Sequence, residues 1–189
     1  MITLRTLLRY SKNKNIFLIT FVVYALTIVS LYLMIRFGRT IVFGDVNELE
    51  ELDVSYFHVF FGNIILIYKT YILGLMTFGL YAFYSHFQNT VGIALVGKQL
   101  LYEGYEKLAY KMIPHGLIEF LGMSLALATV ILFWIKVIKD APDIIKRKKN
   151  FMETVRTLVS TLLVSAIANT FIFAIAGIVE VLVSHIKVM

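Results

Sequence analysis

The sequence predicts an all-α protein: a polytopic membrane helix bundle that forms a single integral membrane domain over residues 1–189. The chain is 59% hydrophobic and only 16% charged, with a mean hydropathy of +0.82, whereas soluble domains carry about 25% charged residues. Long apolar runs recur, and Lys and Arg gather at their ends, where they set membrane orientation. Aromatic residues make up 14% of the chain, and such rings suit the headgroup boundary.

The first predicted helix covers about residues 16–37. It would be about 33 Å long at ~1.5 Å per residue, which is enough to cross a ~30 Å hydrocarbon core. Arg5, Arg9, Lys12 and Lys14 precede it, so the amino end is predicted to be cytoplasmic. The run is longer than the apolar part of a signal peptide, so we expect it to remain as an anchor.

Two loops of opposite charge support this orientation. The segment Gly44 to Ser55 contains acidic residues and no Lys or Arg, so it is predicted to be a short extracytoplasmic loop or surface helix. The segment Lys136 to Asn150 is the most basic in the chain and is predicted to be cytoplasmic.

The second run, residues 56–84, is too long for one upright crossing and carries Lys69 near its middle. A lysine exposed to lipid at that depth is costly. Two interpretations remain open. In one, a tilted helix aims Lys69 at the bundle interior; in the other, residues 57–68 form an interfacial or re-entrant piece and residues 70–84 cross the membrane.

The remaining predicted helices cover about residues 85–112, 114–136 and 154–183. The stretch 85–112 is weakly apolar, but it must cross if the helices on either side of it both end in the cytoplasm. We expect it to cross inside the bundle, away from lipid. Five transmembrane helices result, with the amino end in and the carboxyl end out, in a cell membrane protein.

The stretch Ile113 to Phe120, "IPHGLIEF", carries the most informative polar residues. Pro114 suits the first turn of a helix, because its missing N–H is not needed there. His115 and Glu119 are then one turn apart on one face. An interfacial helix start would explain them, with Glu119 favoured by the helix dipole. A hydrogen-bonded pair that faces the bundle interior is the sharper hypothesis.

A carboxylate at membrane depth needs a partner, so we expect Lys69, Asn89 or Lys98 to complete a polar unit with His115 and Glu119. Further polar candidates in apolar runs are Asn63, Asn169 and Glu180; Asn169 is predicted to join helices by hydrogen bonding. Ala166, Thr170 and Ala174 form a row of small residues that permits close helix approach. The complete predicted intramembrane cluster is Pro114, His115, Gly116, Glu119, Glu180, Asn63, Asn89 and Lys69.

The sequence favours a protein that is not an enzyme. It lacks the H-E-x-x-H, G-x-S-x-G and P-loop motifs, and it contains no Cys. Two ligands on one helix are fewer than a catalytic zinc takes, so no metal and no cofactor is expected. The net charge of +6 lies at helix ends and not along a soluble face, so nucleic acid is not an expected partner.

The pattern of these residues resembles the stage II sporulation protein M family. That family typically shows Asn-Asn, then Asn-Gly, then Pro-His-Gly with a following glutamate, and an acidic residue in the last helix. Here Gly62-Asn63 and Asn89-Thr90 stand in the first two places. Pro114, His115, Gly116 and Glu119 match the third, and Glu180 matches the last.

The resemblance implies a multi-pass membrane subunit without established catalysis. The name-giving member works in a complex with peptidoglycan-degrading partners in sporulation, and relatives occur in gene clusters for circular bacteriocins. We therefore expect a non-enzymatic subunit that engages membrane or secreted proteins in bacteriocin maturation, export or immunity, or in envelope remodelling. The alternatives are a transporter or channel component that passes a peptide or ion, an anchor for a peptidoglycan-remodelling complex, and, third, an intramembrane hydrolase. Membrane lipid is an expected partner, and a homo-oligomer is a further hypothesis.

Overall fold

The computed structural model describes residues 14–38, 56–102, 104–148 and 150–184. The described part contains helices and no strand, which confirms the all-α prediction. Its helices are α2 (Lys14–Phe37), α3 (Tyr56–Met76), α4 (Leu80–Tyr102), α5 (Glu106–Ile145) and α6 (Phe151–Ser184).

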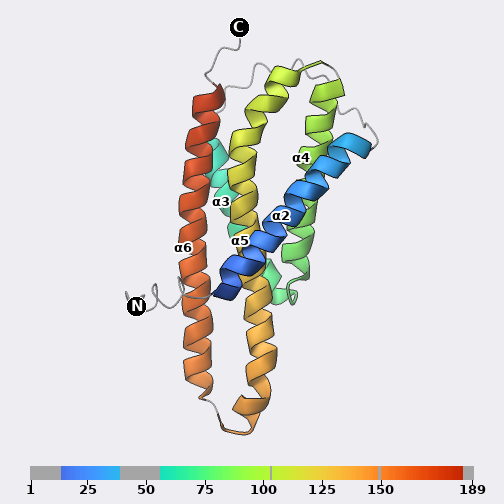
Figure 1. The fold of residues 1–189 in the computed structure, drawn as a ribbon. Coiled ribbons are helices and arrows are strands. Elements are labelled where there is room, and N and C mark those ends of the chain that lie inside the picture. Colours follow the sequence, from blue (N-terminus) through green and yellow to red (C-terminus); the bar gives the residue numbers. More distant parts are fainter. Residues whose placement is uncertain (1–13, 39–55, 103, 149, 185–189) are drawn as a thin grey trace.

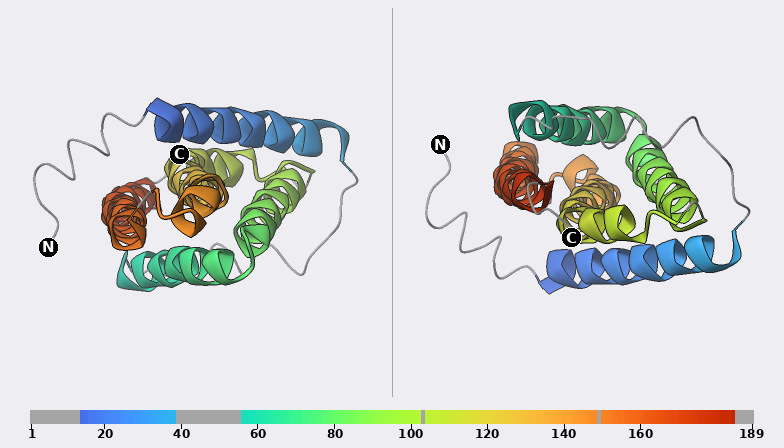
Figure 2. Two further views of the ribbon diagram at one scale, coloured as in Figure 1. Left: turned by 90° about the horizontal axis from the view of Figure 1, so that it is seen from below. Right: turned by 90° about the horizontal axis from the view of Figure 1, so that it is seen from above.

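Helix α5 forms the centre of the bundle. Seen along its length, α2 and α3 cover opposite faces of it, while α4 and α6 lie on the two remaining sides (Figure 2). Helix α2 crosses the bundle obliquely, whereas α5 and α6 run nearly upright as an antiparallel pair (Figure 1). We call the ends of the bundle upper and lower as they are drawn in Figure 1, with the α5–α6 turn at the lower end.

The second apolar run forms two helices that meet in a tight turn at residues 77–79. Phe78 and Gly79 both have positive φ angles, of 54° and 93°, which reverses the chain. The amide of Gly79 donates to the carbonyl of Gly74 at 2.7 Å, and the Thr77 hydroxyl accepts from the amide of Tyr81 at 2.9 Å. These bonds satisfy backbone groups at both helix ends. Both interpretations of the run 56–84 were therefore wrong. The run is not one helix, and its break lies at residues 77–79 instead of near residue 69.

Two other predicted boundaries differ from the structure. The helix predicted at 85–112 is α4 and ends at Tyr102, where a turn containing Gly104 (φ 84°) follows. The helix predicted to start at Pro114 starts at Glu106, so Pro114 lies inside α5. Proline removes one helical hydrogen bond but does not require a new helix start when the flanking turns continue on both sides.

The core lies where α3, α4, α5 and α6 pack closely. Ile67, Ala82, Ala126 and Val130 are fully buried there, together with Phe173 at 1% exposure. A Cβ atom on Gly74 would lie 3.0 Å from the Ala82 Cβ, so glycine lets α3 and α4 approach closely. Ala166, from the predicted row of small residues, packs against this cluster.

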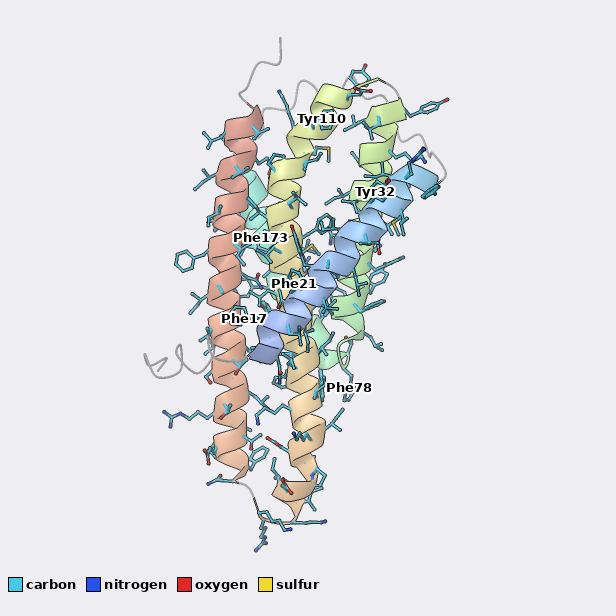
Figure 3. All side chains as sticks on the ribbon, in the orientation of Figure 1. Phe17, Phe21, Tyr32, Phe78, Tyr110 and Phe173 are labelled. Atoms are coloured by element: carbon cyan, nitrogen blue, oxygen red, sulfur yellow. The ribbon has the colours of Figure 1, made fainter. Side chains whose placement is uncertain are left out.

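Three of the described helices are long and apolar enough to cross a membrane: Asn15–Phe37, Tyr110–Ile145 and Phe151–Val183. The outward faces are apolar too, as Phe17 and Phe21 show on α2, at 55% and 67% exposure (Figure 3). Large exposed apolar surfaces of this kind suit contact with lipid. Five crossings, and the amino-in orientation, stay predictions.

The lower part of the α5–α6 pair extends beyond the other helices (Figure 1). Phe78 of the α3–α4 turn packs on Trp134 of α5, with ring centroids 4.4 Å apart. From Trp134 to its end at Ile145, α5 continues for about 16 Å at ~1.5 Å per residue. We call residues 135–148 and 150–157 the lower hairpin.

Candidate functional site

A polar cluster joins three helices in the upper half of the bundle. The side-chain amide of Asn63 on α3 donates a hydrogen bond to the Glu119 carboxylate on α5. Glu180 on α6 lies close enough to interact electrostatically with Glu119. We call Asn63, Glu119 and Glu180 the upper cluster. Its residues come from segments that are far apart in the sequence, and all three side chains are half-buried.

His115 lies one turn before Glu119 on α5, and its Nδ1 atom is buried without a hydrogen-bond partner among the described residues. The structure shows no hydrogen bond between His115 and Glu119 in the described part of the chain. The hydrogen-bond partner of Glu119 is therefore Asn63 and not, as the sequence predicted, His115. Two side chains one turn apart on the same face of a helix need not bind each other when a neighbouring helix offers a closer donor.

The three residues expected to complete the polar unit lie elsewhere. Lys69 is exposed on α3, so it does not point into the bundle. Asn89 donates to the carbonyl of Ser85 on its own helix at 2.9 Å. Lys98 donates to the backbone carbonyl of Gly38, beyond the end of α2. The expectation that one of them would bind Glu119 was wrong.

Pro114 and Gly116 flank His115 but do not join the upper cluster. Pro114 is exposed on α5. Gly116 is buried and lines an apolar cavity of about 150 Å³ between α2, α4 and α5, which Leu31 and Phe120 also line. A Cβ atom at Gly116 would meet no heavy atom within 4 Å. The space there is therefore open.

A second polar network lies below the upper cluster, and its members are all buried. The Asn169 side-chain amide donates to the Tyr71 hydroxyl at 2.6 Å. Tyr71 also bonds the Ser165 hydroxyl at 2.6 Å, and Ser165 bonds Thr129 at 2.7 Å. We call Tyr71, Thr129, Ser165 and Asn169 the middle network. It ties α3, α5 and α6 together in the apolar core, so the prediction that Asn169 joins helices is confirmed.

Phe173 lies on α6 between Asn169 of the middle network and Glu180 of the upper cluster. A Cβ atom on Gly122 would lie 2.7 Å from the Phe173 ring and 3.1 Å from Oδ1 of Asn169. Gly122 is one turn after Glu119, and Phe173 is one turn after Asn169 along α6. The missing side chain at Gly122 therefore leaves room for the Phe173 ring. This aromatic side chain separates the upper cluster from the middle network along α6.

The upper cluster combines two carboxylates with a single amide donor. Lys136 forms an ion pair with Asp140 in the lower hairpin, and among the described residues no ion pair involves Glu119 or Glu180. Like charges at short range repel one another, most strongly where water is scarce. A positive group supplied by another molecule would relieve this repulsion.

The comparison with protein families gives a match to the model described as Stage II sporulation protein M, over residues 15–185. The chain belongs to the stage II sporulation protein M family. Neither the search of curated proteins nor the search of solved structures found a match. The resemblance inferred from the sequence motifs is thus confirmed over nearly the whole chain.

Within this stage II sporulation protein M family member, the structure brings together only some of the motif residues. Asn63 binds Glu119, Glu180 lies within electrostatic range of Glu119, and His115 lies one turn away on α5. Asn89 belongs to a different part of the bundle, on α4.

Sequence reasoning missed several other polar side chains that bind one another across helices. Tyr71 stands in an apolar run and was passed over, although a tyrosine hydroxyl in the middle of such a run normally needs a hydrogen-bond partner. Thr27 of α2 bonds Nε2 of His86 on α4 at 2.7 Å, and Thr70 bonds Ser85 at 3.1 Å. Pairs such as these cannot be read from one sequence, because each joins residues on different helices.

Proposed function

We propose that this protein is a non-enzymatic subunit of a membrane complex, and that it engages partner proteins through the upper end of its bundle. The partners would act in the maturation, export or immunity of a circular bacteriocin, or in remodelling of the cell envelope. Family membership and the apolar helices support a membrane protein, and the site geometry supports partner binding over catalysis.

The observation that carries the proposal is that the upper cluster holds two acidic side chains and no positively charged partner among the described residues. Glu119 and Glu180 come from two helices, and Asn63 supplies an amide hydrogen bond but no positive charge. A Lys or Arg side chain of a partner can form charge-assisted hydrogen bonds with such a pair. The bond from Asn63 to Glu119 fixes one carboxylate in place, so part of the ordering cost of binding is already met.

Affinity purification in a mild detergent tests the proposal. Tagged protein is purified from its own cells, and co-purifying proteins are compared between wild type, Glu119→Gln and Glu180→Gln. Each substitution removes a charge at nearly constant volume, so we expect partners to be lost while the protein stays folded. Asn89→Ala is the matched control, because that residue bonds only within α4 among the described contacts. Isolated wild-type monomer with no co-purifying protein would contradict the proposal.

The biological setting needs a separate experiment. Deletion of the gene is followed by measurement of secreted circular peptide and of sensitivity to it, and in parallel by measurement of peptidoglycan remodelling during sporulation. The bacteriocin setting predicts a change in the first pair of measurements only. A defect limited to engulfment would assign the protein to an anchor for peptidoglycan-degrading partners.

A transporter or channel component is the second candidate. Helix α4 favours it, because it buries several polar side chains inside the bundle: Ser85, His86, Thr90 and Gln99. Polar groups at membrane depth often line a pathway. Purified protein in liposomes should then pass a peptide or an ion faster than protein-free liposomes, and His86→Leu should slow the flux. Equal leak with and without protein would remove this candidate.

A further inference from the structure

The lower hairpin carries an apolar stripe on the side of α5 that faces away from α6. Ile135, Ile138, Pro142 and Ile145 follow one another at spacings of three, four and three residues. At ~100° per residue they span about 80° of the helix surface. The isoleucines are 51%, 70% and 81% exposed, in chain order. We call these four residues the lower stripe.

Positive charge borders the lower stripe. Lys139 and Lys146 lie along one flank, seven residues apart, and Arg147 and Lys148 follow at the tip; all four are exposed. The α5 part of the lower hairpin contains two carboxylates, but Asp140 is buried and bonds Lys136 at 2.7 Å, and Asp143 is half-buried and has a bonding partner. A third carboxylate, Glu153, is exposed on α6. The surface that an incoming molecule meets is therefore apolar in its middle and basic at its edge.

The position of the outer half of the stripe, Pro142 and Ile145, disfavours lipid as its occupant, whereas Ile135 and Ile138 lie within about 6 Å of the level of Trp134 along α5. Trp134 packs on the α3–α4 turn, where those two helices end, so it marks the lower level of the bundle. Lys146 stands about 18 Å beyond that level at ~1.5 Å per residue. Headgroups fill only about 5 to 7 Å outside the hydrocarbon. The remaining distance exceeds the Debye length of ~8 Å at physiological salt, so attraction to the membrane surface is largely screened.

The charge disfavours an antiparallel pairing of two copies of this chain. Such a pairing would bring the flank with Lys139 and Lys146 of one copy against the same flank of the other. Such like-charge contacts oppose association.

The spacing and the charge together describe one partner. Apolar positions at alternating intervals of three and four residues accept the side chains of another helix as knobs into holes. Basic residues beside such a seam pair with acidic residues of the incoming helix. We infer that the lower stripe docks an amphipathic helix with an acidic flank, contributed by a partner protein. This inference rests on the proposed function, for which it names a second contact and the chemistry of the partner.

A designed probe tests the docking surface directly. The probe is a labelled peptide of about three heptads, with Leu at the seam positions and Glu beside them; its counterpart has Lys in place of every Glu. The full-length protein is placed in nanodiscs of zwitterionic lipid, and binding is followed by fluorescence anisotropy. We expect the acidic peptide to bind and the basic one not to bind.

Variants then locate the site. Ile138→Asp, and the double reversal Lys139→Glu with Lys146→Glu, should each weaken binding of the acidic peptide by roughly tenfold or more. The double reversal should gain affinity for the basic peptide, which a merely misfolded protein would not do. Arg156→Glu is the control, since that exposed residue lies on α6 of the same hairpin, away from the stripe.

Three outcomes would overturn the inference: no binding of the acidic peptide, equal binding of both peptides, or equal losses for Arg156→Glu and the stripe variants. The lipid alternative is tested by flotation of the nanodiscs with vesicles of phosphatidylserine and phosphatidylcholine. Flotation that the double reversal abolishes, without peptide binding, would assign the stripe to lipid. If the acidic peptide does not bind but partners still co-purify in a way that depends on Glu119 and Glu180, the docking inference is wrong and the proposed function stands.

Discussion

Asn63 of α3 donates a hydrogen bond to the Glu119 carboxylate of α5, and so links two helices through residues 56 positions apart. The bond joins the first and the third elements of the family pattern, which the sequence could only place in separate segments. It also leaves His115, the neighbour of Glu119 by helical spacing, without this role.

Loss of the Asn63 amide should destabilise the fold more than loss of the Glu119 charge. Asn63→Ala leaves the carboxylate without its donor, at a cost of about 1 to 2 kcal/mol. Glu119→Gln keeps an acceptor and should cost less. Unfolding in detergent gives the free energies, and the double variant should be little worse than Asn63→Ala, because the residues interact directly. Asn89→Ala serves as the control, and additive effects of Asn63 and Glu119 would refute the coupling.

The Tyr71 hydroxyl should be the most important single group of the middle network. It accepts from Asn169 and bonds Ser165, and neither of those side chains reaches solvent. Tyr71→Phe leaves buried polar atoms without partners, which costs about 1 to 3 kcal/mol. Tyr68→Phe is the matched control, because the hydroxyl of Tyr68 makes only a 3.4 Å contact with Thr170 at the exposed surface. Equal unfolding free energies for the two variants would show that the Tyr71 hydroxyl stabilises the fold no more than the exposed Tyr68 hydroxyl does.

Gly122 should not tolerate a larger side chain. The Cβ atom of Gly122→Ala would lie 2.7 Å from the Phe173 ring, so the packed core must shift at a cost of about 1 to 3 kcal/mol. Adding Phe173→Leu should recover part of this loss by removing the ring. Gly116→Ala is the comparison, since its Cβ would enter open space and alanine, the better helix former, should raise the unfolding free energy by up to about 1 kcal/mol. Similar melting temperatures for both alanine variants would contradict this account.

The orientation of the bundle can be tested with single cysteines, because the chain contains none. An impermeant thiol reagent added to intact cells should label Glu106→Cys, at the upper end, and should not label Lys148→Cys, at the lower end. A cysteine in the acidic segment 44–55, which lies outside the described residues, should also be labelled. Labelling of residues 106 and 148 to the same extent would break the topology of five crossings.

Sequence reasoning reached the helical class from the apolar runs and the family from the motif residues, because both are local properties of the sequence. It could not orient the helices about their axes. In α6 apolar residues cover every side, so periodicity does not reveal the buried face. The outward direction of Lys69 and the Asn63–Glu119 bond both depend on that rotation.

The turn at 77–79 escaped prediction for a different reason. Thr77, Phe78 and Gly79 interrupt an apolar run without a proline or a charge, and Phe78 adopts a positive φ angle that bulky residues rarely take. The Thr77 side chain, which accepts from Tyr81, was the available clue, since threonine is a common helix cap.

The two prolines of α5 divide it into mechanically different parts. At Pro114 and Pro142 the carbonyls of Tyr110 and Ile138 have no amide to accept from, so the helix is softer at those points. Residues 115–141 between them keep an unbroken ladder and include Thr129 of the middle network. Bending at either proline can therefore redirect an end of α5, beside His115 above or within the lower stripe below, while the stiff central segment holds the core unchanged.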